Sequence, residues 1–198
     1  MKHYGIFLGI DHTSGGMSQY AKAQLDAFKS MHDMGDRVTV AYISDEWSKV
    51  LEAYPFNRVQ LKGGWFGLKL ADALMVARIP APLTRLISSV ANPIVRQLKR
   101  LKCDMWVFPA QDALSYQIGG PVLATIHDLM HLYEPHFPEV TSSGRPSIRE
   151  HRFSNIAQAA TGILVDSEVG RQHVIESYHT DASKIFPLPY IPPPHSLI

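Results

Sequence analysis

The sequence predicts an α/β fold with a doubly wound, mainly parallel sheet of the Rossmann-like kind. Short apolar runs alternate along the chain with longer amphipathic runs, which is the pattern of strands separated by helices. Most of the short runs are apolar at every position, as expected of strands that helices cover on both faces. The length of 198 residues suits one domain of this kind.

The predicted elements follow the chain in an order typical of such a sheet. Strands are expected at Tyr4–Ile10, Arg37–Ile43, Arg58–Leu61, Asp104–Pro109, Pro121–His127, Gly162–Asp166 and Lys184–Leu188. Helices are expected at Met17–Met34, Trp47–Ala53, Leu68–Ala77, Leu83–Leu101, Ser147–Ala160 and Ser167–Tyr178.

Several boundaries carry residues that begin or end helices. Gly35 follows the first long helix and suits a left-handed C-terminal residue. Pro93 interrupts the run 83–101, and Asn92 before it can cap a new helix, so we expect two helices or a kink there. Ser167 stands between a strand and a helix and can cap that helix.

The C-terminal tail is rich in proline from Pro187 to Pro194. Proline prevents a helix or a central strand and favours an extended connector. We therefore expect residues 1–186 to form the domain and residues 187–198 to lead toward another domain.

Composition narrows the classes of function. The net charge of +1 is too balanced for a protein that grips nucleic acid through its phosphates, so no nucleic-acid partner is expected. The single cysteine, Cys103, forms no internal disulfide and fits a reducing compartment. The apolar stretch Ile6 to Ile10 is too short for a signal peptide, and no run approaches the ~18 apolar residues of a membrane span. These features predict a cytoplasmic protein.

Gly15 and Gly16 lie between the first strand and the first helix. Two glycines let a ligand approach the backbone, and a helix N-terminus offers N–H groups and partial positive charge to a phosphate. An ordinary tight turn is the alternative, and the three spaced glycines of a dinucleotide fingerprint are absent from this segment.

His127 and Asp128 end a predicted strand. Ligands of doubly wound sheets bind outside the carboxyl ends of the strands, so both residues are candidates for substrate contact, and His127 should meet the glycine turn there. The alternative is that His127 only closes the strand. His127 and His131 have the spacing of a zinc-binding helix, but Asp128 stands where the motif needs Glu, so no metal site is expected.

The segment from Leu129 to Gly144 is long for a connection in an α/β fold, and long loops are often functional. Arg145, Arg149 and Arg152 follow it at helical spacing. They are candidates for holding an anionic substrate, and solvated surface arginines are the alternative.

Two further segments suggest a surface contact. The basic run 96–102 ends an amphipathic stretch, where its cations suit a helix C-terminus and its apolar residues suit the core. A peripheral contact with an anionic membrane is the alternative. Trp65 and Phe66, between glycines, could pack on a sugar, on lipid or in the core.

In order and spacing, these motifs resemble the N-terminal domain of GT4-like glycosyltransferases with a GT-B fold. The resemblance rests on Gly15-Gly16 followed by Tyr20-Ala21, on Thr125-Ile126-His127-Asp128-Leu129 with prolines downstream, and on Ile163-Leu164-Val165 before Ser167-Glu168. It covers nearly the whole chain.

The resemblance implies an acceptor-side domain that faces a nucleotide-sugar-binding domain across a cleft, with no cofactor. Gly15, Gly16 and Asp128 would contact the donor phosphate or sugar, and His127 would contact the transferred sugar near the reacting carbon. Arg145, Arg149, Arg152 and His131 would be candidates for binding a glycan or lipid-linked acceptor. Transfer would retain the anomeric configuration, and the donor phosphate would help deprotonate the acceptor hydroxyl.

The family's Glu-x7-Glu pair belongs to the second domain. Here that spacing occurs as Glu168 and Glu176, in the first domain, so we interpret it as a coincidence of solvent-facing residues. The chain alone is therefore expected to be inactive. Two non-catalytic hypotheses remain: a nucleotide-binding regulatory module, and a protein-interaction module that uses Trp65, Phe66 and the basic run.

Overall fold

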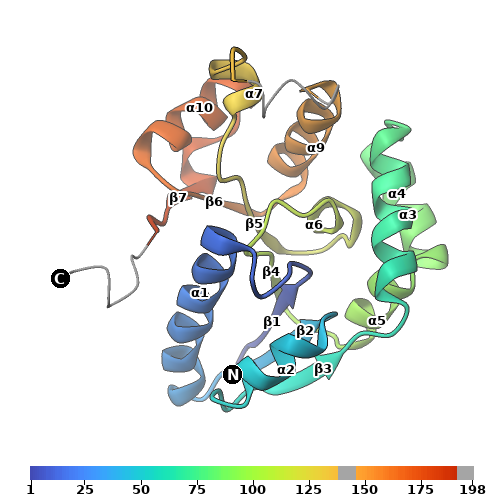
Figure 1. The fold of residues 1–198 in the computed structure, drawn as a ribbon, viewed down its shortest axis with the longest axis vertical. Helices are drawn as coiled ribbons and strands as arrows, with labels where there is room; N and C mark the ends of the chain where they lie inside the picture. The colour runs from blue at the N-terminus through green and yellow to red at the C-terminus, as the bar shows by residue number, and fades with distance from the viewer. Residues whose placement is uncertain (138–145, 191–198) are drawn as a thin grey trace.

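The computed structural model describes residues 1–137 and 146–190, and within them seven strands form one sheet (Figure 1). The strand order is β3-β2-β1-β4-β5-β6-β7, and every neighbouring pair is parallel. The predicted doubly wound, Rossmann-like sheet is confirmed, with all seven predicted strands present. The strands are β1 (His3–Leu8), β2 (Arg37–Tyr42), β3 (Asn57–Gln60), β4 (Met105–Val107), β5 (Val122–Thr125), β6 (Gly162–Val165) and β7 (Ile185–Pro187).

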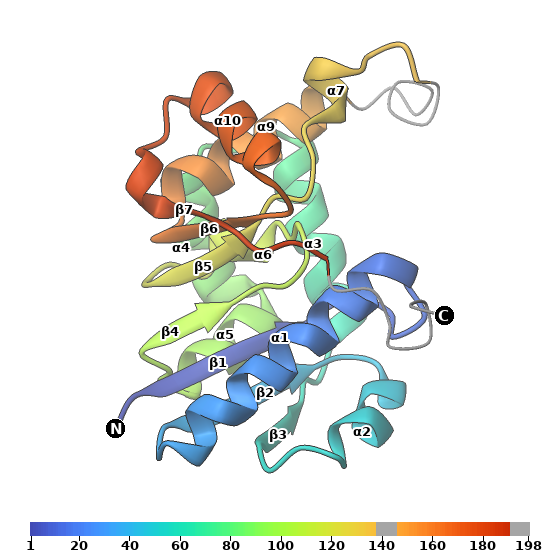
Figure 2. The same cartoon turned by 90° about the vertical axis from the view of Figure 1, so that its left-hand side faces the viewer.

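Helices cover both faces of the sheet (Figure 2). The helices are α1 (Gly15–Asp33), α2 (Asp45–Leu51), α3 (Gly64–Val76), α4 (Ala81–Ala91), α5 (Pro93–Arg100), α6 (Leu114–Gln117), α7 (Met130–Tyr133), α9 (Pro146–Ala159), α10 (Glu168–Tyr178) and the 3-10 helix η1 (Ala182–Lys184). Side chains of β1 alternate between two cores: Ile6 and Leu8 pack with α1 and α2, whereas Phe7 packs with α3, α5, α6 and α9. This double burial explains the continuously apolar strands.

The helix-boundary residues act as predicted. Gly35 has φ +97°, and its N–H donates to the carbonyl of His32 while that of Asp36 donates to Met31, which closes α1 with a Schellman motif. The run 83–101 is two helices, because Asn92 caps α5 by accepting hydrogen bonds from the N–H groups of Ile94 and Val95. Ser167 caps α10 through a 3.0 Å hydrogen bond from the Gly170 N–H.

Four helices differ from the prediction. α1 begins at Gly15 and α3 begins at Gly64. Glycines that were expected to lie in the segments before these helices therefore form their first turns. α6 and α7 have four residues each, which is too short to show a helical period in the sequence. The predicted loop after Leu129 therefore begins with a helical turn.

The topology brings the functional candidates to one edge of the sheet. The chain moves from β1 toward β3 in one direction and from β4 toward β7 in the other, so β1 and β4 are neighbours that mark the switch point. The segments that follow β1, β4, β5 and β6 all begin at the carboxyl edge. In the described part of the chain, no helix is long and apolar enough to cross a membrane.

Candidate functional site

His127 lies two residues beyond the end of β5, and only 6 % of its side chain is exposed. Its Nδ1 atom is 2.9 Å from Oδ1 of Asp166, which directly follows β6. A carboxylate only accepts hydrogen bonds, so Nδ1 carries a proton, and in the tautomer that this selects Nε2 is the acceptor. Nε2 is buried and has no hydrogen-bond partner among the described residues. The site therefore contains an oriented imidazole with one buried nitrogen that has no partner among the described residues.

The rings of two tyrosines pack against the imidazole. The ring of Tyr20 meets it edge-on, with 5.0 Å between centroids, and the ring of Tyr190 lies 5.6 Å away. The Tyr190 hydroxyl is 3.2 Å from His127 Nδ1. Burial, with a smaller effect of the Asp166 charge, raises the pKa of Tyr190 to about 12 and that of Tyr20 further. Both tyrosines are therefore neutral near pH 7.

The glycine turn lies beside this aromatic cluster. Gly15 has φ +53°, a left-handed conformation that favours glycine. A Cβ atom on Gly16 would come 3.4 Å from the Tyr190 ring, which in turn packs on His127. Ser14 makes no side-chain hydrogen bond to the first turn of α1, and that turn holds no acidic residue. The structure thus brings the turn and His127 together, as the sequence predicts, and phosphate contact remains a prediction.

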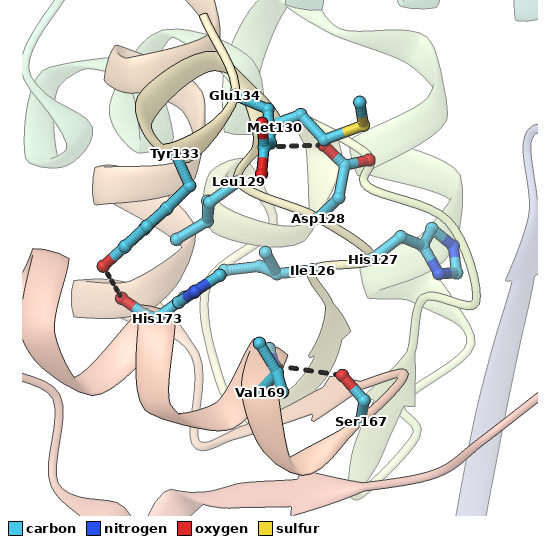
Figure 3. A pocket seen from close by; sticks show the side chains of 11 residues that line it. Ile126, His127, Asp128, Leu129, Met130, Tyr133, Glu134, Ser167, Val169 and His173 are labelled. Carbon is cyan, nitrogen blue, oxygen red and sulfur yellow. Dashed lines mark hydrogen bonds between the residues drawn. The ribbon is translucent and has the colours of Figure 1, made fainter.

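A pocket of about 170 Å³ adjoins His127 between β5, α7 and α10 (Figure 3). Asp128 lines it, and its Oδ1 accepts a 3.1 Å hydrogen bond from the Met130 N–H. Tyr133 stacks on His173 at the opposite wall, with 3.5 Å between ring centroids. Figure 3 shows the His127 ring on the far side of the pocket from this stacked pair. The pocket is mostly apolar, and Asp128 and His127 are among its polar lining residues.

His131 is buried between α7 and α9. Its Nε2 atom is 3.1 Å from Oε2 of Glu150, and its ring lies 5.4 Å from that of Phe153. Burial lowers the pKa of this histidine, although Glu150 opposes the shift. The side chain is 1 % exposed, so its contacts are with the interior, and a contact with an acceptor remains a prediction that would require α7 to move.

The described residues that lie close enough together to hold a metal ion are Asp11, His12 and Glu46, not the pair of histidines with zinc-motif spacing. His12 Nδ1 is 2.7 Å from Glu46 Oε2.

The predicted arginines lie close to carboxylates. Nη2 of Arg149 is 3.9 Å from Oδ1 of Asp128. Arg152 lies over the Phe153 ring at 4.8 Å and lines a second pocket that also contains Asp112. Arg145 lies outside the described residues. Arg149 and Arg152 therefore lie among carboxylates and do not form a purely basic cluster. Their binding of an acceptor remains a prediction.

Two residues of the site were not predicted. Asp166 follows β6 at the same edge as His127, so the rule that selected His127 would also have selected it. Tyr190 lies in the proline-rich tail, where no sequence pattern indicated a contact with His127.

Other candidates lie away from the imidazole. Glu168 is exposed and pairs with Arg171 at 2.8 Å, and Glu176 is exposed and accepts a hydrogen bond from Gln172. The interpretation of this spacing as solvent-facing residues is confirmed. In the basic run, Leu98 belongs to the core, while Arg96, Lys99, Arg100 and Lys102 are exposed.

No protein-family model matches the chain, and no curated protein matches it. Among solved structures, it is similar to HepE of Anabaena in complex with UDP, with 14% identity and a TM-score of 0.55 over 96% of this chain and 44% of HepE. A glycosyltransferase of Rickettsia africae matches 95% of this chain and 43% of its own, at 12% identity and a TM-score of 0.49. The glycotransferase of kitacinnamycin matches 97% of this chain and 52% of its own, at 14% identity and a TM-score of 0.42.

The chain therefore spans less than half the length of HepE. At this identity the likeness concerns the fold alone. The chain has a Rossmann-like α/β fold that it shares with part of HepE.

Proposed function

We propose that this chain is the acceptor-side, N-terminal domain of a GT-B glycosyltransferase of the GT4 type. Residues 187–198 would connect it to a domain that binds the nucleotide sugar. The observation that carries the proposal is the meeting of a helix N-terminus without a side-chain cap and a buried, oriented imidazole at one edge of a doubly wound sheet. The shared fold with part of HepE, which was solved with UDP, supports it.

Each group has a role that follows from its chemistry. The backbone at Gly15 and Gly16 would approach the donor phosphate, which the partial positive charge of α1 attracts. Asp128 would accept hydrogen bonds from sugar hydroxyls. His127 Nε2 would hydrogen-bond a hydroxyl of the transferred sugar and favour the charge that develops at the reacting carbon. Retention of configuration, and deprotonation of a glycan or lipid-linked acceptor by the donor phosphate, follow from the family resemblance.

Sugar transfer by the natural polypeptide that contains this chain tests the proposal. His127→Ala should lower turnover by about 100- to 1,000-fold, the usual effect of removing a preorganised polar contact. His32→Ala, at the far end of α1, is the matched control and should leave turnover unchanged. Residues 1–198 alone should turn over no donor. Near-normal turnover by His127→Ala would remove the imidazole from the mechanism.

A nucleotide-binding module without catalysis is the second candidate, and the N-terminus of α1, which has no side-chain cap, favours it equally. It predicts that residues 1–198 alone bind a nucleotide with micromolar affinity. Calorimetry without heat for common nucleotides and nucleotide sugars would count against it.

We also propose that this protein contacts an anionic membrane surface from the cytoplasmic side. Residues 62–102 carry eight of the 19 Lys and Arg residues of the chain and one of its 18 Asp and Glu residues, Asp72. The α4 helix turns its apolar side outward: Leu86 and Val90 are 63% and 69% exposed, whereas Thr84 and Ser88 are buried. Trp65 and Phe66 are exposed at the start of α3, which like α4 packs on α5 and α6. Exposed apolar side chains flanked by cations suit an anionic lipid surface.

Sedimentation with phosphatidylglycerol vesicles tests this contact. Leu86→Asp should weaken binding by about tenfold or more, because one leucine side chain leaves the bilayer. Val169→Asp, at an exposed apolar position on α10, should not change it. Equal binding by Leu86→Asp, or no preference over phosphatidylcholine vesicles, would instead favour a protein partner for this surface.

A further inference from the structure

A second pocket opens at the switch point of the sheet. It has a volume of about 370 Å³, within the range of roughly 300–1,000 Å³ typical of small-molecule sites. Residues that follow β1 and β4 line it together with side chains of α1, α3 and α9: Ile10, Met17, Leu68, Asp72, Ala110, Gln111, Asp112, Ala113 and Arg152. The chain leaves β1 toward α1 on one face and β4 toward α6 on the other, and the crevice between diverging connections is where ligands of such sheets bind.

Asp112 is the central polar group of this switch-point pocket. Its Oδ1 atom accepts a 2.8 Å hydrogen bond from the Leu114 N–H. Its Oδ2 atom faces the backbone of Gly9, where a Cβ atom would come within 2.9 Å of it. Burial raises the pKa of this carboxyl to about 6, and the charge of Arg152 opposes the shift. At neutral pH a negative charge is held in a poorly solvated place, where additional hydrogen-bond donors would stabilise it.

Two further polar atoms of the pocket lack partners. Oε1 of Gln111 and Nε of Arg152 are buried and make no hydrogen bond within residues 1–137 and 146–190. An unsatisfied buried polar atom is costly, so each is expected to find a partner in a ligand or in ordered water. Gln111 Oε1 and the Asp112 carboxylate require donors, whereas Arg152 Nε–H requires an acceptor. A hydroxyl group is both donor and acceptor, so a ligand with neighbouring hydroxyls can satisfy all three.

The charge balance limits the kind of ligand. Asp72 and an ionised Asp112 face one guanidinium, that of Arg152, so the pocket has no surplus of positive charge for an anion. The apolar side chains of Ile10, Met17 and Leu68 offer a surface for the C–H face of a sugar ring.

We propose that the switch-point pocket binds a neutral, hydroxyl-bearing sugar unit of the acceptor. Asp112 and Gln111 accept hydrogen bonds from its hydroxyls, and Arg152 donates one. The proposal rests on the proposed transferase function and narrows the acceptor: a sugar ring, not an anionic head group, is its anchor. Arg152 donates one hydrogen bond to the sugar and does not form part of a cluster of arginines that binds an anion.

Saturation-transfer NMR on the 198-residue chain at pH 7.5 tests the pocket. The probes are the neutral methyl glycosides of glucose, galactose, mannose and N-acetylglucosamine, with glucuronic acid, glucose 6-phosphate and glucosamine for comparison. At least one neutral glycoside should bind, and the acids should bind more weakly. Asp112→Asn, which keeps the shape and the hydrogen bond from Leu114, should raise the dissociation constant about tenfold, and Gln111→Leu should also raise it. Asp33→Asn, on the exposed end of α1, should leave it unchanged.

The proposal is overturned if no neutral glycoside binds, if glucose 6-phosphate binds better than the neutral sugars, or if Asp112→Asn binds like the unaltered chain. Sugar binding that survives Asp112→Asn but disappears in His127→Ala would assign the sugar to the other pocket. Transfer assays separate the two proposals. If the natural polypeptide transfers no sugar but the switch-point pocket binds glycosides, the transferase function is refuted and the pocket is not. If the natural polypeptide transfers sugar and Asp112→Asn leaves its acceptor KM unchanged, the proposal that the switch-point pocket binds the acceptor is refuted.

Discussion

Two pockets open at the same edge of one sheet, and their polar atoms differ in how far the protein satisfies them. Near His127, Nδ1 is hydrogen-bonded to Asp166 and the Asp128 carboxylate accepts a hydrogen bond from the Met130 N–H, while Nε2 of His127 has no partner among the described residues. In the switch-point pocket, Gln111 Oε1 and Arg152 Nε have no partner among the described residues. The comparison teaches that the first region holds its unsatisfied atom in a fixed orientation, whereas the second leaves two unsatisfied atoms on different elements for a ligand to bridge. Substitutions in the two regions should therefore affect different measurements.

Asp166→Asn should have the largest effect of the three substitutions that test the comparison. An amide placed at Nδ1 no longer enforces the tautomer that leaves Nε2 as the acceptor, and it removes a charge-assisted hydrogen bond. Because hydrogen bonds to charged groups contribute about 1.5–3 kcal/mol, turnover should fall about 10- to 100-fold. Steady-state kinetics of sugar transfer by the natural polypeptide measure this, and the acceptor KM should change little. A change confined to the acceptor KM would mean that Asp166 belongs to acceptor binding and would end the distinction between the pockets.

Asp112→Asn should change stability as well as binding. The pKa of Asp112 rises from 3.8 to about 6 on folding. Between these values the folded chain holds a proton that the unfolded chain has lost, so stability decreases as pH rises through this window and stays lower above it. Replacing the charge with an amide should raise the free energy of unfolding at pH 7.5 by about 1–3 kcal/mol. The nearby charges are Arg152, which reduces this gain, and Asp72, which increases it.

Urea denaturation measures that gain, which should disappear near pH 4, where the folded carboxyl is protonated. If Asp112→Asn is more stable and binds sugar less well, the Asp112 carboxylate contributes to binding and reduces stability. If Asp112→Asn is less stable than the parent at pH 7.5, the carboxylate supports the fold, and the switch-point pocket loses its contrast with the His127 region.

The sheet could be predicted from sequence because its strands are buried on both faces, which leaves the same local signature at each one. The position of His127 followed from a rule of topology, and Asp166 obeys the same rule. The switch-point pocket is different, since Asp72, Asp112 and Arg152 lie on elements far apart in the chain. Their convergence depends on how α3 and α9 pack against the sheet, and no local pattern encodes that packing. For the same reason the helical spacing of Arg149 and Arg152 could not show which carboxylates they meet.

Tyr190→Phe should have the smallest effect and gives the finest test of the His127 region. The substitution removes a hydroxyl 3.2 Å from His127 Nδ1 and keeps the ring that packs on Tyr20 and beside Gly16. Asp166 remains the nearer partner of Nδ1, so the loss is that of one neutral hydrogen bond, worth about 0.5–1.5 kcal/mol, or about a two- to tenfold decrease in turnover. The pKa of Tyr190 is about 12, so the decrease should be the same between about pH 6 and pH 9. If Tyr190→Phe lowers turnover as much as Asp166→Asn does, the proline-rich tail and not the residue after β6 positions the imidazole.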